Sequence, residues 1–221
     1  MFKIAMQEPR WWYDFLKMLV DLWEKHQRIS DFYPIWADVF VFVYPIFLSY
    51  QYLKGMITKN KLFKQEALII FFSCLFSVIV NILSQQFFDK QRPIYELGTV
   101  VLDKDTILHQ FLPVTSFPSD HAVVTFSIAM ATLLLALRSH NKNLKIWSGF
   151  LFLFAVITGL CRIGTTVHRT TDILAGMVVG ILTPVVLFLP KPHELLTCYV
   201  IDPIISFETR LMNKLFKRKT E

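Results

Sequence analysis

Two histidines and an aspartate with the spacing of a catalytic group lie at the edges of long apolar stretches. His168 and Asp172 are four residues apart, which places both side chains on one face of a helix. The carboxylate can then hold one imidazole nitrogen as N–H and leave the other free to attack as a nucleophile. His121 lies in similar surroundings and can protonate a departing oxygen. These residue types predict a group-transfer reaction through a covalent histidine intermediate.

Arginines and a helix start near these histidines supply groups that bind phosphate. Arg92 and Arg162 keep their charge and present planar forks that fit phosphate oxygens. Ser119 follows a proline at the expected start of a helix, where unpaired backbone N–H groups face an anion. Each signal alone has an ordinary explanation, because an interfacial arginine often only extends to the headgroup layer. Together they predict phosphoryl transfer by positioning and charge neutralisation, without a metal.

Five apolar stretches supply the helices that must carry these residues. A soluble domain averages about 45–50% apolar residues, whereas this chain of 221 residues has 54%. About 20 mostly apolar residues span a bilayer, and the segments near that length are residues 35–53, 67–88, 121–137, 146–162 and 173–189. The prediction is an all-α integral membrane protein, a bundle of five to six transmembrane helices, and a buried soluble bundle is disfavoured.

The two ends of the chain are amphipathic instead of uniformly apolar. Residues 10–29 mix tryptophans and aliphatic residues with charged ones at helical spacing, which predicts a helix lying in the membrane interface. A tilted, partly buried sixth helix is the alternative. Residues 203–219 are also amphipathic and end in a basic segment suited to an anionic leaflet. The expected organisation is one membrane-embedded domain over residues 1–221, with an interfacial helix in 1–32, a transmembrane core in 33–190 and a basic cytoplasmic tail in 191–221.

The uneven charge of the connections predicts the orientation of the spans. The net charge is +6, and the excess lysines and arginines lie in the first connection, the third connection and the tail. Five spans place these segments on one side, which the positive-inside rule makes cytoplasmic. The polar clusters around Arg92, Ser119 and His168 then share the opposite face and can meet in one cavity. Basic residues placed between spans indicate membrane orientation, so no nucleic-acid partner is expected.

The order and spacing of the motifs resemble the type 2 phosphatidic acid phosphatase superfamily of integral-membrane lipid phosphatases. The matching residues, within roughly residues 35–190, are Arg92-Pro93, Pro118-Ser119-Asp120-His121, and Arg162 followed by His168 and Asp172. The resemblance implies that Arg92, Ser119 and Arg162 bind the phosphate. It also implies that His168 forms a phosphohistidine, that His121 protonates the departing group and that Asp172 orients His168. No metal or other cofactor is implied.

Three positions depart from the family pattern. The family usually has Lys seven positions before the first-motif Arg, where this chain has Gln85, so Lys90 is a candidate replacement for that phosphate clamp. Cys161 stands where Ser is usual before Arg162, and Asp120 stands where Gly is usual. The resulting PSDH motif is similar to that of small bacterial undecaprenyl-diphosphate phosphatases linked to bacitracin resistance. Those enzymes also resemble this chain in length, in an amphipathic N-terminal segment and in a basic C-terminal tail.

The leading hypothesis from this resemblance is hydrolysis of undecaprenyl diphosphate, a cell-wall lipid carrier, to undecaprenyl phosphate. The reaction would occur on the outer face of a bacterial inner or plasma membrane, with the C-terminus in the cytoplasm. Alternatives within the superfamily are phosphatases or phosphotransferases acting on phosphatidylglycerol phosphate, phosphatidic acid or lipid A phosphates. A non-catalytic protein that binds lipid phosphates is an alternative of another class, and a transporter fits less well because the charges lie at span ends. The expected partners are a polyprenyl or other lipid phosphate and membrane lipids, and residues 94–116 are long enough to form a lid.

Overall fold

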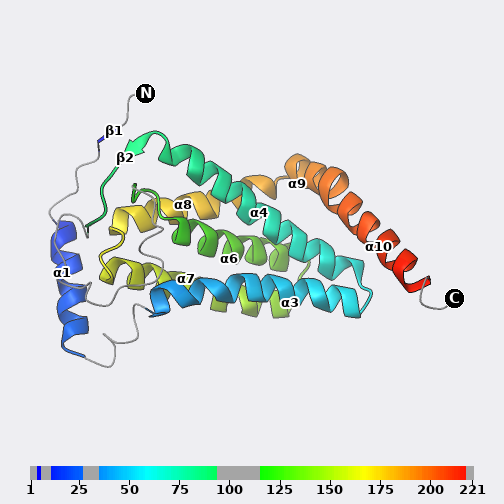
Figure 1. The fold of residues 1–221 in the computed structure, drawn as a ribbon, viewed down its shortest axis with the longest axis horizontal. Helices are drawn as coiled ribbons and strands as arrows, with labels where there is room; N and C mark the ends of the chain where they lie inside the picture. Colours follow the sequence, from blue (N-terminus) through cyan, green and yellow to red (C-terminus); the bar gives the residue numbers. More distant parts are fainter. Residues whose placement is uncertain (1–3, 6–10, 27–34, 94–114, 218–221) are drawn as a thin grey trace.

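Long helices running side by side form the body of this computed structural model, which describes residues 4–5, 11–26, 35–93 and 115–217 (Figure 1). They are α3 (Val43–Ile57), α4 (Lys61–Gln85), α6 (Asp120–Arg138), α7 (Lys142–Gly164) and α8 (Thr170–Leu187). The last four are long and apolar enough to cross a membrane. Helix α6 lies among α4, α7 and α8 and packs against each of them. The prediction of a helical membrane bundle is confirmed.

The first predicted span is an interrupted helix. Residues 35–39 are helical and lead through the 3-10 turn η1 (Phe40–Phe42) into α3, which alone has 15 residues. Pro45 lies in the first turn of α3 and has no N–H to donate to the preceding turn, which accounts for the tighter turn before it. The other four predicted spans coincide with α4, α6, α7 and α8. Helices α4 and α7 begin before their apolar stretches because Asn60 and Asn141 cap their N-termini through side-chain oxygens.

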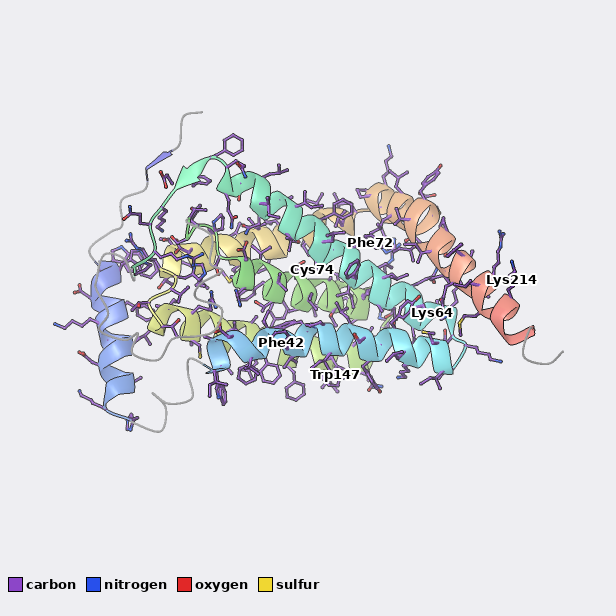
Figure 2. The ribbon with its side chains drawn as sticks, viewed as in Figure 1. Phe42, Lys64, Phe72, Cys74, Trp147 and Lys214 are labelled. Atoms are coloured by element: carbon purple, nitrogen blue, oxygen red, sulfur yellow. The ribbon has the colours of Figure 1, made fainter. Side chains whose placement is uncertain are left out.

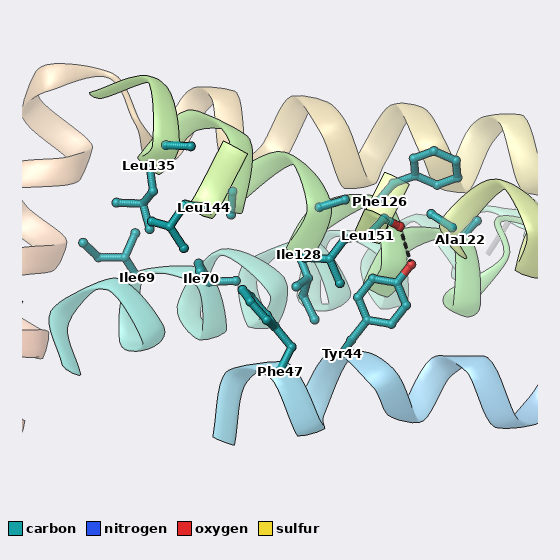
Figure 3. Packing of buried hydrophobic residues seen from close by; sticks show 14 of the residues in the cluster. Tyr44, Phe47, Ile69, Ile70, Ala122, Phe126, Ile128, Leu135, Leu144 and Leu151 are labelled. Atoms are coloured by element: carbon teal, nitrogen blue, oxygen red, sulfur yellow. Dashed lines mark hydrogen bonds between the residues drawn. The ribbon is translucent and has the colours of Figure 1, made fainter. Parts of the chain in front are cut away.

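The interior of the bundle is a cluster of aliphatic and aromatic side chains (Figure 3), and hydroxyl groups form hydrogen bonds between its helices. The fully buried Tyr44 donates its hydroxyl to the Leu151 carbonyl oxygen at 2.8 Å, which links α3 to α7. The hydroxyls of Ser77 and Ser127 contact each other at 2.9 Å between α4 and α6. Such pairing matters within a bilayer because hydrocarbon offers polar groups no water.

Helix α1 (Trp11–Glu24) lies across the end of the bundle where α7 ends and α8 begins (Figure 1). Its 14 residues are too few to span a bilayer. Trp12 and Leu19 are buried, whereas Trp11 and Leu22 are exposed. This placement favours the interfacial helix over a sixth span. The strands β1 (Ile4–Ala5) and β2 (Phe88–Asp89) form a two-residue parallel pair nearby.

The chain beyond α8 forms a bent helical segment at the opposite end. It consists of α9 (Pro190–Leu196), the π-helical η3 (Thr197–Ile201) and α10 (Asp202–Lys217). Helix α10 contacts α4 through an ion pair of Lys64 with Glu208 at 2.8 Å (Figure 2). The predicted lid falls outside the described residues except for its last two, and so do the extreme ends of both amphipathic segments.

Two glycines of α8 allow its close approach to α6. A Cβ added at Gly176 would lie 2.6 Å from the Ser119 carbonyl oxygen, and one at Gly180 would lie 2.7 Å from the Val123 carbonyl oxygen. We therefore expect Gly180→Ala to lower the free energy of unfolding by about 1–3 kcal/mol, which is measured as a lower Tm in detergent. Gly149→Ala is the matched control, because its new Cβ meets no atom within 4 Å. Equal Tm values for the two variants would contradict the close packing of α6 and α8.

Candidate active site

The polar clusters recognised in the sequence meet at the end of the bundle beside α1. Arg92 follows β2, Ser119 precedes α6, Arg162 lies in the last turn of α7, and His168 lies in the turn between α7 and α8. Each of these side chains is at most 3% exposed. Burying two arginines in a membrane protein is costly unless they are paired or bind an anion, so their convergence marks a functional site.

The His168 ring is held at both nitrogens. Nδ1 lies 3.0 Å from the Ser116 carbonyl oxygen and 3.6 Å from Oδ2 of Asp172. Nε2 lies 3.3 Å from a terminal nitrogen of Arg92. Because both neighbours of Nδ1 only accept and a guanidinium only donates, Nδ1 carries the proton and Nε2 carries the lone pair. The nearest group orienting His168 is therefore a backbone carbonyl, and the Asp172 carboxylate stands just beyond hydrogen-bond distance.

The surroundings keep His168 neutral. Burial, followed by the positive charges of Arg162 and Arg92, lowers its pKa from 6.5 to about 4, although Asp172 opposes the shift. A neutral imidazole with its lone pair on Nε2 is the form that attacks an electrophile. At neutral pH the site therefore holds a neutral imidazole between two cations.

This shift predicts a pH dependence. We expect protonation of His168 to lower kcat/KM only near pH 4 and below, because the neutral, reactive imidazole is the main form above that pH. Between pH 6.5 and 4 the unfolded chain binds a proton that the folded protein does not, so stability falls as the pH falls. The measurement is kcat/KM and Tm over this range, with the ionisation of the lipid phosphate determined separately. A His168 limb near 6.5 would contradict the geometry.

Asp172 has three neighbours and occupies the third position of α8. Its Oδ2 accepts from the Arg169 backbone N–H at 2.9 Å, which caps the helix, and it also faces His168. Its Oδ1 forms an ion pair with Lys90 at 2.6 Å, and both side chains are almost completely buried. The structure thus places Lys90, the candidate replacement for the family's phosphate clamp, on the carboxylate behind the nucleophile. Its ammonium also donates to Thr171 Oγ1.

Arg162 connects the second histidine to a carboxylate of the first span. One of its terminal nitrogens lies 2.8 Å from Asp38 Oδ1 and 3.4 Å from Nε2 of His121. Among the described residues, Nε of Arg162 and the buried hydroxyl of Ser119 have no hydrogen-bond partner. Two unpaired donors beside two cations fit the oxygens of a phosphate.

Two of the departures from the family pattern contact each other. The amide of Gln85 donates to Asp120 Oδ1 at 3.0 Å and to the Pro118 carbonyl oxygen at 3.1 Å. Asn81, one turn earlier on α4, donates to the same Asp120 oxygen at 2.6 Å. Neutral amides therefore hold the Asp120 carboxylate. Gln85, at the position where the family usually has Lys, supports the loop before α6.

Sequence reasoning missed Asp38, Asn81 and the Ser116 carbonyl. Asp38 is the one carboxylate of the first predicted span, and Asn81 lies inside the second. Polar residues inside a span are costly and are functional candidates for that reason. That signal could have found both. The carbonyl of Ser116 gives no signal in a sequence, because every residue has one.

Comparisons with known proteins show the family of the chain. Residues 66–192, more than half of the chain, match the family model described as the PAP2 superfamily. The chain is 33% identical over 89 residues to the bacitracin transport permease protein BcrC of Bacillus licheniformis, which covers 38% of this chain and 40% of that protein. It is also 33% identical over 107 residues to the undecaprenyl-diphosphatase BcrC of Bacillus subtilis (strain 168). This match covers 48% of this chain and 49% of that protein. The matches therefore span about half the length of these curated relatives or less.

A solved structure shares the fold. The crystal structure of Aquifex aeolicus LpxE superposes with a TM-score of 0.55 at 20% identity, and the match covers 83% of this chain and 98% of that one. At this identity the likeness shows the fold alone. The helical bundle, the motif residues gathered at one end of it and the family match over residues 66–192 lead to one assignment. The chain belongs to the PAP2 superfamily.

Proposed function

We propose that this protein is a membrane lipid phosphatase that hydrolyses undecaprenyl diphosphate to undecaprenyl phosphate and inorganic phosphate. The observation that carries the proposal is the lone pair on Nε2 of His168, held beside Arg92 within a buried cationic site. Family membership and the likeness to an undecaprenyl-diphosphatase over about half of its length support the substrate. The proposed location is the outer end of a bacterial membrane bundle, with α10 on the cytoplasmic side.

The geometry supports a two-step transfer. The terminal phosphate lies among Arg92, Arg162 and Ser119, whose donors bind its oxygens. Nε2 of His168 attacks phosphorus, the bond from phosphorus to the bridging oxygen breaks, and undecaprenyl phosphate leaves. Water then attacks the phosphohistidine and breaks its P–N bond. The products are inorganic phosphate and the original imidazole.

The contact of His121 with Arg162 favours a diphosphate substrate. Because a guanidinium only donates, Nε2 of His121 carries a lone pair and no proton in this contact. A phosphate leaving group departs as a stable anion, whereas the alcohol of a phosphate monoester needs a proton as it departs. Because Nε2 of His121 carries no proton in the resting site, the site is better suited to cleaving a diphosphate than a phosphate monoester.

This argument predicts that the effect of His121→Ala depends on the substrate. We expect the variant to lower turnover of monoester lipids such as phosphatidic acid by about 10²–10⁴-fold, and turnover of undecaprenyl diphosphate by less than about 10-fold. The measurement is phosphate release by purified protein in detergent, with a chelator present to test the predicted independence of metals. An equal loss on both substrates would contradict the preference for a diphosphate. A wild type that prefers the monoester would count against undecaprenyl diphosphate itself.

A further inference from the structure

A polar cavity lies at the end of the bundle opposite to the candidate active site. Its volume is about 240 Å³, and it lies between α3, α4 and the start of α7. Gln51 and Lys54 line it from α3, Glu66 from α4 and Trp147 from α7. None of these residues takes part in the proposed reaction, so the cavity needs a separate explanation.

Two unpaired acceptor oxygens line this cavity. Gln51 is only 5% exposed, and its Oε1 has no hydrogen-bond partner. Oε2 of Glu66 is likewise buried without a hydrogen-bond partner. The charge of Lys54 acts on this carboxylate, but none of the close ion pairs among the described residues includes Glu66. Leaving a buried acceptor unpaired is costly, and more so for a carboxylate. The two oxygens therefore fit a ligand that donates several hydrogen bonds and carries positive charge.

A cation of the protein lines the same cavity. The ammonium of Lys54 lies over the Phe63 ring, 4.5 Å from its centroid, and both residues line the wall. A ligand that satisfies both kinds of group carries an ammonium for Gln51 and Glu66 and an anionic group for Lys54. A zwitterion with a primary amine and a phosphate meets this requirement.

The position of the cavity identifies where such a zwitterion would come from. Trp147 is 40% exposed and Ile146 is 60% exposed near the start of α7, and the Trp147 ring packs against Phe47 of α3 with a centroid distance of 5.5 Å (Figure 2). Tryptophan at the end of a span is typical of headgroup depth. The cavity is therefore reached from the headgroup layer, where zwitterions are phospholipid headgroups.

We propose that this cavity binds the ethanolamine headgroup of a membrane phospholipid. The primary ammonium donates to Oε1 of Gln51 and to the carboxylate of Glu66, while the phosphate lies toward Lys54. A choline headgroup has no N–H to donate, and a glycerol headgroup has no positive charge. The site therefore distinguishes phosphatidylethanolamine from both, independently of the reaction at the other end of the bundle.

Thermal unfolding in lipid nanodiscs tests the site. We expect the wild type to unfold at a Tm higher by about 2–4 °C or more in phosphatidylethanolamine than in phosphatidylcholine with the same acyl chains. Glu66→Gln should remove this difference without changing lipid phosphate turnover. Glu194→Gln, on an exposed position outside the cavity, should keep the difference. Equal Tm values in the two lipids, or an unchanged difference in Glu66→Gln, would overturn the proposal.

Native mass spectrometry gives a second readout that does not depend on a variant. The wild type released from mixed micelles should retain phosphatidylethanolamine in preference to phosphatidylcholine and phosphatidylglycerol. Retention of the three lipids in proportion to their abundance would also overturn the proposal.

Discussion

Replacing His168 with alanine is expected to abolish phosphate release from undecaprenyl diphosphate, a loss of at least about 10⁴-fold. The variant removes the proposed nucleophile, Nε2, whose lone pair faces Arg92 at 3.3 Å. Arg92 and Arg162, the proposed phosphate-binding residues, remain in place. The variant should therefore bind the lipid with little loss of affinity and fail in the chemical step.

The control for this variant is His193→Ala. His193 lies on α9 at the other end of the bundle, and its ring makes an edge-to-face contact with Phe188. Its loss should leave turnover close to that of the wild type. Full activity of His168→Ala, measured as phosphate released per unit of folded protein, would show that another group attacks phosphorus.

Replacing Lys90 with methionine is expected to lower kcat by about 10²-fold or more. The ion pair with Asp172 lies between side chains that are 1% and 0% exposed, so the change leaves a buried carboxylate without its partner. Removing one member of a buried pair costs about 3–5 kcal/mol. The Asp172 carboxylate will move or take up a proton. The His168 ring will then lose the negative charge that faces its Nδ1.

The kinetic constants distinguish two roles for Lys90. A positioning residue that acts through Asp172 affects mainly kcat, whereas a phosphate clamp that binds substrate and transition state equally affects mainly KM. Lys64→Met is the control, because Lys64 also forms an ion pair, with Glu208 at 2.8 Å, at the opposite end of the bundle, although that pair is less completely buried. That variant should lose stability and keep its kcat. A rise in KM with unchanged kcat in Lys90→Met would assign Lys90 to the phosphate.

The helices could be predicted from the sequence because a bilayer demands long apolar segments. Each of α4, α6, α7 and α8 contains one such stretch, and polar caps such as Asn60 only shift the boundaries. The interruption before α3 was not predicted, although Pro45 provides the signal. The direction of the chain placed the motifs at one end of the bundle. Each span ends on the face of the membrane where the next one begins, so the end of the second span, the start of the third, the end of the fourth and the start of the fifth share one face.

The pairing of charges within the site could not be predicted. The spacing of His168 and Asp172 indicates a shared helix face, and it does not show that Lys90 takes one carboxylate oxygen. The pair of Arg162 with Asp38 joins residues 124 positions apart, and only the packing of the first span against α7 brings them together. Motif residues can be recognised by their order, whereas the residues that hold them are fixed by tertiary contacts.

Direct detection of a phosphohistidine is the measurement that tests the central claim. Purified protein is mixed with undecaprenyl diphosphate labelled in its terminal phosphate, quenched rapidly in alkali and digested, and the labelled peptide is sequenced. The account predicts acid-labile label on His168 in the wild type and none in His168→Ala. Label on another residue, or phosphate release with no labelled protein at any quench time, would contradict it.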